Sequence, residues 1–306
     1  MDEMICLCYG AEGELLGRVV PVSFRLQRDE DAPADSLEVE VPGSLPPLCT
    51  VELRAGNERW FAGVVDEQNE TADPNGRRTE LVCRSFEAVL MDNQAVAGTV
   101  RHPSRRAMEH WQLRPLGIGC TGGQAQVFGG EYTVPFGADV YTALQRFGQL
   151  YFGSGALWME DRHTLHFGER EPVRHVLPKV TAVTLCRRPV ERISDVVMQN
   201  PLSGVYDAVL GNRAAKKAGV LRRRFLRAGD NRGAEKLAAG EKAAFALVLT
   251  VPGGVNVRPG DRVDAVLRPL GCRDAEGAKV VSLRCSGTSA GVVTRLETEA
   301  EEISLR

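Results

Sequence analysis

The chain has 306 residues, of which 43% are hydrophobic and 25% are charged. These values are ordinary for a globular protein, and a chain of this length buries enough surface to form a core without disulfides or a metal, which excludes disorder as its main state. Its 38 basic and 40 acidic residues give a net charge of −2, which excludes an overall field that would attract nucleic acid or anionic lipid.

Residues 1–95 show the pattern of antiparallel strands. Residues 36–41 alternate polar and apolar side chains, which is typical of a half-buried strand. Two turn sequences, at residues 55–58 and 73–76, separate further apolar runs and predict hairpins. A short helix over residues 85–93 follows. The sequence therefore predicts a small antiparallel β-barrel over residues 1–95.

Residues 96–178 have a different pattern, which predicts an inserted α+β subdomain. Ser104 is placed to cap a short helix that runs through Trp111, and residues 117–130 are expected to form a Gly-rich loop. The best helical pattern of the chain comes next, with Asp139 as its N-cap and Gly153 as its stop. Its apolar positions are Val140, Ala143, Leu144, Phe147, Leu150 and Tyr151. A hairpin over residues 156–167 completes the insertion.

Strands resume after residue 178 and predict a second, similar β-barrel over residues 179–306. Within it, residues 231–244 are rich in alanine and are expected to be partly helical. The expected strands are residues 183–187, 195–199, 206–210, 245–251, 262–267, 278–285 and 291–297.

The eight cysteines do not have the spacing of a metal site or a disulfide framework. They are residues 6, 8, 49, 83, 120, 186, 272 and 285, with no C-x-x-C pair. If residues 6 and 8 lie on a strand, both thiols point to one face. We expect reduced, structural thiols.

Two glycine motifs match known site patterns by letter only. Residues 117–122 read G-x-G-x-x-G, but the buried strand before and the helix after that a nucleotide site requires are not indicated. Residues 287–291 read G-x-S-x-G, but no histidine follows Ser289, and the pattern around it is strand–turn–strand.

The only histidine cluster is His163 and His166 with His175. The first two residues bracket a hairpin turn, so their side chains need not converge on a metal, and a surface hairpin is the better interpretation. With 40 acids and no anchoring motif, no pair of catalytic carboxylates can be assigned. The sequence thus predicts no catalytic, cofactor or metal residues.

Residues 213–236 are the sharpest charge feature, with nine basic and two acidic residues and a local net charge of +7. An acidic protein partner or subunit is favoured over a solvated surface. Nucleic acid is disfavoured, because Phe225 is the only aromatic residue within the segment.

Several stretches resemble the opening of tail baseplate hub proteins, the late control protein D type of phages and phage-like contractile particles. They are residues 34–43, 51–53, 60–65, 81–86 and 90–93. The resemblance continues through residues 139–167, 200–206, 222–226 and 259–261, so it covers most of the chain. Leu37 stands where the family usually has an aromatic residue, and the Gly-rich residues 117–130 match nothing in the family pattern.

The resemblance implies two tube-like β-barrels per chain and a homotrimer whose six barrels imitate a hexameric ring. Such a structural hub adapts a sixfold tail tube protein to a threefold spike protein, with a tape measure protein as a further partner, and it is not an enzyme. It implies assembly in the cytoplasm and then a place in the virion or tail-like particle, with no membrane and no sequence-specific nucleic acid as partner.

The subunit interface expected in such a ring pairs Arg222, Arg223 and Arg224 with the acidic residues Glu297, Glu299, Glu301 and Glu302 of a neighbour. Two alternatives stay open: a β-barrel hydrolase, and a monomeric carbohydrate- or nucleic-acid-binding barrel protein. A hydrolase requires a cleft with paired acids, and a binding module stays monomeric, whereas a hub forms trimers.

Overall fold

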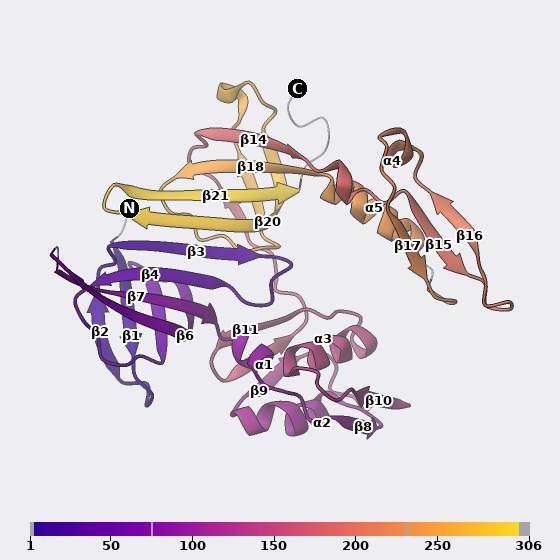
Figure 1. Ribbon diagram of the computed structural model, residues 1–306, viewed down its shortest axis with the longest axis horizontal. Helices are drawn as coiled ribbons and strands as arrows, with labels where there is room; N and C mark the ends of the chain where they lie inside the picture. The colour runs from indigo at the N-terminus through magenta and orange to yellow at the C-terminus, as the bar shows by residue number, and fades with distance from the viewer. Residues whose placement is uncertain (1–2, 75, 231, 300–306) are drawn as a thin grey trace. The chain divides into compact units, whose positions relative to one another are not determined.

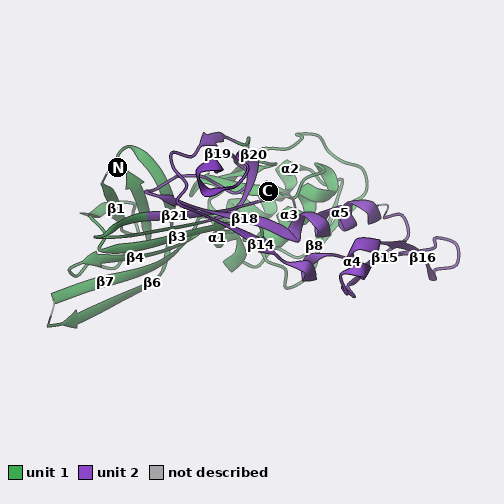
Figure 2. Ribbon diagram, turned by 90° about the horizontal axis from the view of Figure 1, so that it is seen from above, with its two compact units in different colours: residues 1–172, 284–292 green, residues 173–283, 293–306 purple. Residues whose placement is uncertain are grey.

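The computed structural model describes residues 3–74, 76–230 and 232–299. The chain is mainly β, as predicted, with large antiparallel sheets (Figure 1). It divides into two compact units: residues 1–172 with 284–292 form unit 1, and residues 173–283 with 293–306 form unit 2 (Figure 2). These limits differ from the three domains expected from the sequence, whose division at 95/96 and 178/179 stays a prediction.

The main sheet of unit 1 is built from the N-terminal strands in the order β20-β3-β4-β7-β6-β5-β1-β2. Its members are β1 (Met4–Tyr9), β2 (Leu15–Val19), β3 (Ser23–Asp29), β4 (Ser36–Pro42), β5 (Thr50–Ala55), β6 (Glu58–Asp73), β7 (Gly76–Ser85) and the end of β20 (Ala275–Thr288). The alternation predicted for residues 36–41 is confirmed, because Leu37, Val39 and Val41 are fully buried while Ser36 and Glu38 face solvent.

A second core in unit 1 lies around the predicted helix, which is confirmed as α3 (Val140–Tyr151). Asp139 caps it by accepting a hydrogen bond from the Thr142 amide at 2.6 Å. Phe147 is fully buried, but Leu150, which was expected on the apolar face, is 60% exposed. The other elements here are α1 (Ala88–Asp92), β8 (Gly98–Arg101), α2 (Arg105–Met108), β9 (Gly119–Gly122), β10 (Glu131–Val134), β11 (Leu157–Asp161) and β12 (Thr164–Phe167).

The Gly-rich stretch is not wholly a loop, which corrects the expectation for residues 117–130. Its residues Gly119–Gly122 form β9, which pairs in parallel with β12 of the predicted hairpin. A Cβ atom on Gly122 would strike the carbonyl oxygen of Phe167, so glycine permits this close strand contact. The cap predicted at Ser104 is confirmed, because its hydroxyl accepts a hydrogen bond from the Ala107 amide at 3.1 Å.

Unit 2 holds a sheet in the order β14-β18-β21-β20, to which β19 and β13 are attached beside β20. The bounds are β13 (Arg174–Val176), β14 (Ala182–Arg187), β18 (Phe245–Pro252), β19 (Arg262–Ala265) and β21 (Gly291–Glu299). Residues 284–292, the end of β20 and the start of β21, belong to unit 1.

A separate three-stranded sheet in unit 2 has the order β16-β15-β17, from β15 (Asp195–Gln199), β16 (Tyr206–Gly211) and β17 (Arg223–Leu226). Two helices accompany it, α4 (Arg213–Lys217) and α5 (Gly233–Ala243), and α5 packs against β15 (Figure 1). The helix α5 fills most of the segment 231–244, for which partial helix was predicted.

Neither sheet is seen to close into a barrel. Within the described residues the strand order of unit 1 ends at β2 and that of unit 2 at β14, and no pairing joins either end to another strand. The tube-like barrels are therefore not confirmed. Among the helices of the described part, none is both long and apolar enough to cross a membrane.

Candidate functional site

The three arginines of the predicted interface lie where β17 begins, and they have different partners. Arg222 donates a hydrogen bond to the Glu191 carboxylate at 2.8 Å and another to the carbonyl oxygen of Val190 at 3.0 Å. Arg223 lies 3.8 Å from the Asp195 carboxylate. Arg224 has no acidic partner among the residues that the structure describes.

The predicted acidic partners lie on β21 and are already paired within the chain. Arg188 donates two hydrogen bonds to Glu297, at 2.6 and 2.9 Å, and this contact raises the pKa of Arg188. Glu299 lies 4.0 Å from Lys242 and 3.7 Å from Lys279. Glu301 and Glu302 lie outside the described residues. The arginines and the described acidic residues of the predicted interface therefore do not contact each other within one chain.

Sequence inspection missed the acid that organises the basic segment. The side chain of Asp195 is only 6% exposed, and its carboxylate lies 2.5 Å from the Lys216 ammonium as well as near Arg223. The hydrogen bond from Lys216 holds the pKa of Asp195 below its usual range. The signal was present as an acid beside the apolar run of β15, but its contact with Arg223 depends on the parallel pairing of β15 with β17.

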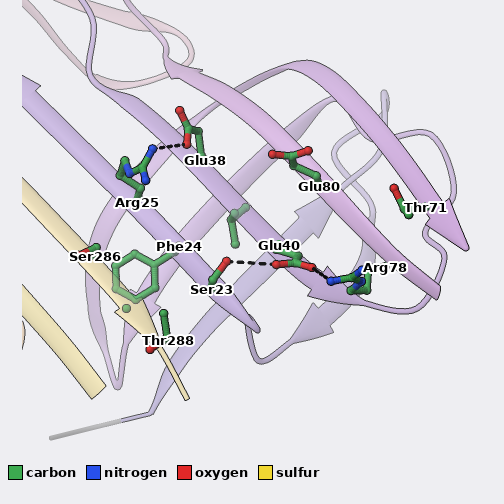
Figure 3. Close-up of a pocket in the computed structure, with 12 residues that line it drawn as sticks. Ser23, Phe24, Arg25, Glu38, Glu40, Thr71, Arg78, Glu80, Ser286 and Thr288 are labelled. Carbon is green, nitrogen blue, oxygen red and sulfur yellow. Dashed lines mark hydrogen bonds and ion pairs between the residues drawn. The ribbon is translucent and has the colours of Figure 1, made fainter. Parts of the chain in front are cut away.

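A polar groove of about 550 Å³ lies on the solvent side of β3, β4 and β7 in unit 1 (Figure 3). Arg25 donates to Glu38 at 3.1 Å, while Glu40 accepts from Ser23 at 3.3 Å and from Arg78 at 3.0 Å. The other lining residues are Phe24, Val39, Thr71, Glu80, Ser286, Gly287 and Thr288.

The groove holds a pair of acids that face each other across two strands. Glu40 and Glu80 are directly opposite each other on β4 and β7, and Arg78 offsets their repulsion. No histidine or cysteine is found among the described residues that line the groove.

The G-x-S-x-G sequence has a packing role at the edge of this groove. It spans the strand–turn–strand between β20 and β21, as predicted, with Ser289 in the turn. A Cβ atom on Gly287 would strike the ring of Phe24, so glycine lets the end of β20 pass over that ring. Figure 3 shows Phe24 beside Ser286 and Thr288.

The histidines of the hairpin β11–β12 are held separately. The His166 Nδ1 atom lies 2.8 Å from the Thr121 hydroxyl, and its ring stacks on Trp158 with a centroid distance of 3.8 Å. His163 faces the carbonyl oxygen of Gly117 instead. Within the described ranges, no group of three or more histidine, cysteine or acidic side chains is arranged to hold a metal ion.

All eight cysteines are free thiols. Cys6 and Cys8 lie on β1 with both side chains buried on one face, as their spacing predicts, and their sulfur atoms are 3.8 Å apart. Contact with Cys8 and burial raise the pKa of Cys6, so that thiol stays protonated at neutral pH.

Comparison with known proteins finds no matching family model and no matching curated protein. Solved structures do match. A tail protein from Neisseria meningitidis has a TM-score of 0.73 at 18% identity, covering 99% of this chain and 98% of that one. The chain has the fold of phage tail proteins.

Two further structures support this assignment of fold. The 43 kDa tail protein of prophage MuSo2 from Shewanella oneidensis has a TM-score of 0.70 at 15% identity, with 97% of this chain and 98% of that chain covered. A chain of the Francisella PdpA–VgrG complex has a TM-score of 0.58 at 7% identity, with 99% of this chain and 53% of that chain covered. The resemblance to tail baseplate hub proteins seen in the sequence is thereby confirmed for the fold.

Proposed function

We propose that this chain is a structural hub in the tail of a phage or of a tail-like contractile particle, where three copies form a ring between the tail tube and the spike. The observation that carries the proposal is the fold match over nearly the full length of both chains with two tail proteins. The match to a chain of the PdpA–VgrG complex supports a spike protein as one partner. The protein acts as a scaffold rather than as an enzyme, and a tape measure protein is a further candidate partner.

Exposed sheet edges support a ring of several copies. Among the described residues, the strand β2 pairs only with β1, and Leu15 and Leu16 on it are 56% and 37% exposed. The strand β14 ends the strand order of unit 2 in the same way within the described residues. Apolar free edges promote aggregation of a monomer, and neighbouring subunits in a ring would cover them.

Within the basic segment, Arg224 remains the proposed contact between subunits, with one change to its expected partner. Because Glu297 and Glu299 are paired within the chain, the acidic surface that Arg224 meets on a neighbour has to lie elsewhere or compete with Arg188, Lys242 and Lys279. Arg224 is the best candidate for this contact, since Arg222 and Arg223 already face acids of their own chain.

The test is the oligomeric state of the purified protein. Light scattering should give three times the 33.3 kDa chain mass, and electron microscopy should show rings with threefold symmetry. A monomer at high protein concentration would contradict the hub and favour the binding-module alternative. Release of a soluble product from a polysaccharide, lost in a Glu40→Gln variant, would instead favour the hydrolase.

A further inference from the structure

The three-stranded sheet of unit 2 has one covered face and one open face. On the covered side, Val196, Met198 and Leu226 form a small core with Leu237 of α5. On the other side, Val209 and Phe225 flank Val197 in one row across the sheet. Val209 is 59% exposed and Phe225 is 62% exposed. Because side chains alternate along a strand, Val197, Val209 and Phe225 lie on the side of the sheet that faces away from α5.

An aromatic pair extends this open side. The ring of Tyr206 meets the ring of Phe225 edge to face, with centroids 5.3 Å apart, and Tyr206 is 40% exposed. We name the side of the sheet that carries Tyr206, Val209 and Phe225 the open face. Two aromatic rings and an aliphatic side chain gathered on one side of the sheet form an exposed apolar patch, which marks an interaction site as scattered single apolar residues do not.

One end of the open face carries excess positive charge. Arg223 shares the face with Phe225 because residues two apart on a strand point the same way. Arg223 and Lys216 both face the single carboxylate of Asp195, at 3.8 and 2.5 Å, so one positive charge is left over. Nearby, Arg213, Lys217 and Arg227 have no acidic partner in the part of the chain that the structure describes.

We propose that the open face docks an acidic segment of another protein in the particle, with apolar side chains on Tyr206, Val209 and Phe225 and carboxylates against Lys216 and Arg223. This rests on the hub function and deepens it, because it names the surface and the chemistry by which the chain would dock one of its partners. The excess of cations selects an acidic partner, because opposite charge is favoured and like charge is rejected at the rim of an interface. One aromatic pair, in place of a row of stacking platforms, disfavours single-stranded nucleic acid.

The experiment uses fluorescence anisotropy on the full chain with three defined probes. They are a labelled twelve-residue peptide of alternating glutamate and leucine, a matched peptide of alternating lysine and leucine, and a twelve-nucleotide oligothymidylate. Variants are the pair Val209→Thr and Phe225→Ser, and separately Arg223→Glu. Phe136→Ser is the matched control, because Phe136 is 91% exposed in unit 1.

The acidic peptide should bind the wild type. Each open-face variant should bind this peptide about tenfold more weakly, while the Phe136 control should bind it as the wild type does. Arg223→Glu should also reduce the salt dependence of binding. Equal binding to all variants, no binding of the acidic peptide, or tighter binding of the lysine peptide or oligonucleotide would overturn the proposal.

Light scattering on the same samples separates this proposal from the hub. If the open-face variants become monomeric while the wild type is trimeric, the face lies between copies of this chain and the proposal is wrong. If the wild type itself is monomeric yet binds the acidic peptide at the open face, the hub fails and the docking surface stands.

Discussion

Arg28 and Arg25 lie on the same strand, β3, but face opposite sides of the sheet. Arg28 is only 1% exposed, and its guanidinium donates to the Asp35 carboxylate at 3.1 Å and to the carbonyl oxygen of Trp60. Arg25 pairs with Glu38 in solvent. A buried arginine is thus part of the core of unit 1, where a sequence pattern favours an apolar residue.

The first prediction compares the two arginines. Arg28→Ala should lower the free energy of unfolding by about 2–4 kcal/mol, since it leaves the Trp60 carbonyl without its partner and removes the buried methylene stem. Arg25→Ala is the control and should cost about 0.5 kcal/mol or less, as exposed ion pairs do. Urea denaturation measures both, and equal losses would contradict the assigned role of Arg28.

The second prediction concerns the pH dependence of stability through Glu87. Its carboxylate accepts hydrogen bonds from the Ser85 hydroxyl and from the Met159 amide, both at 2.7 Å, and burial raises its pKa. A carboxyl whose pKa is raised on folding stabilises the folded state below its unfolded pKa. That stability is lost as the pH rises through the folded pKa.

The melting temperature of the wild type should therefore fall relative to that of Glu87→Gln as the pH rises above about 4.5. The amide of the variant keeps an acceptor for Met159 but does not titrate. Calorimetry across this pH range checks the slope, with Glu80→Gln, whose side chain faces the groove, as the control. A difference that is flat with pH would show that Glu87 does not titrate as proposed.

At the scale of elements, α3 contains a glycine at a position where helix propensity alone would favour alanine. Gly148 is buried within the helix, and a Cβ atom there would lie 2.7 Å from the carbonyl oxygen of Ser154. The glycine lets the chain after the helix turn back closely across it.

Gly148→Ala should therefore destabilise the protein by about 1–2 kcal/mol, although alanine gains about 1 kcal/mol in an unstrained helix. Arg146→Ala, on the exposed side of the same helix, should change stability by less than about 0.5 kcal/mol. Thermal unfolding compares the two variants. If Gly148→Ala is instead more stable than the wild type, the segment after α3 can move away from the added methyl group without loss of stability.

Local patterns in the sequence predicted what local physics determines. The alternation of β4, the cap and period of α3 and the hairpin β11–β12 follow from side-chain spacing. The groove could not be predicted, because it needs β20 beside β3, and these strands are far apart in sequence. The partners of the basic segment were missed for the same reason, since Asp195 meets Arg223 only through the register of β15 with β17.

At the scale of the whole molecule, substitutions of Arg222, Arg223 and Arg224 test whether the chain forms the proposed trimeric ring. Arg224→Glu should shift the protein from trimer toward monomer, because it reverses a charge that has no acidic partner among the described residues of its own chain. Stability should change little. Light scattering at two salt concentrations measures the shift, which should be larger at low salt.

Arg222→Glu serves as the comparison, since it also breaks the contact with Glu191 and should lower the melting temperature of the chain itself. The triple reversal of Arg222, Arg223 and Arg224 should block assembly altogether. A trimer that survives the triple reversal would show that this segment does not join subunits.

The return of residues 284–292 to unit 1 has a consequence for synthesis on the ribosome. Residues 1–172 emerge first, but the strand that completes their sheet beside β3 follows only after residues 173–283 have been made. At roughly 5–20 residues per second, the edge of β3 waits on the order of ten seconds for its neighbour. During that interval the nascent chain presents an unpaired strand edge, and such an edge is a template for aggregation if the chain is released early.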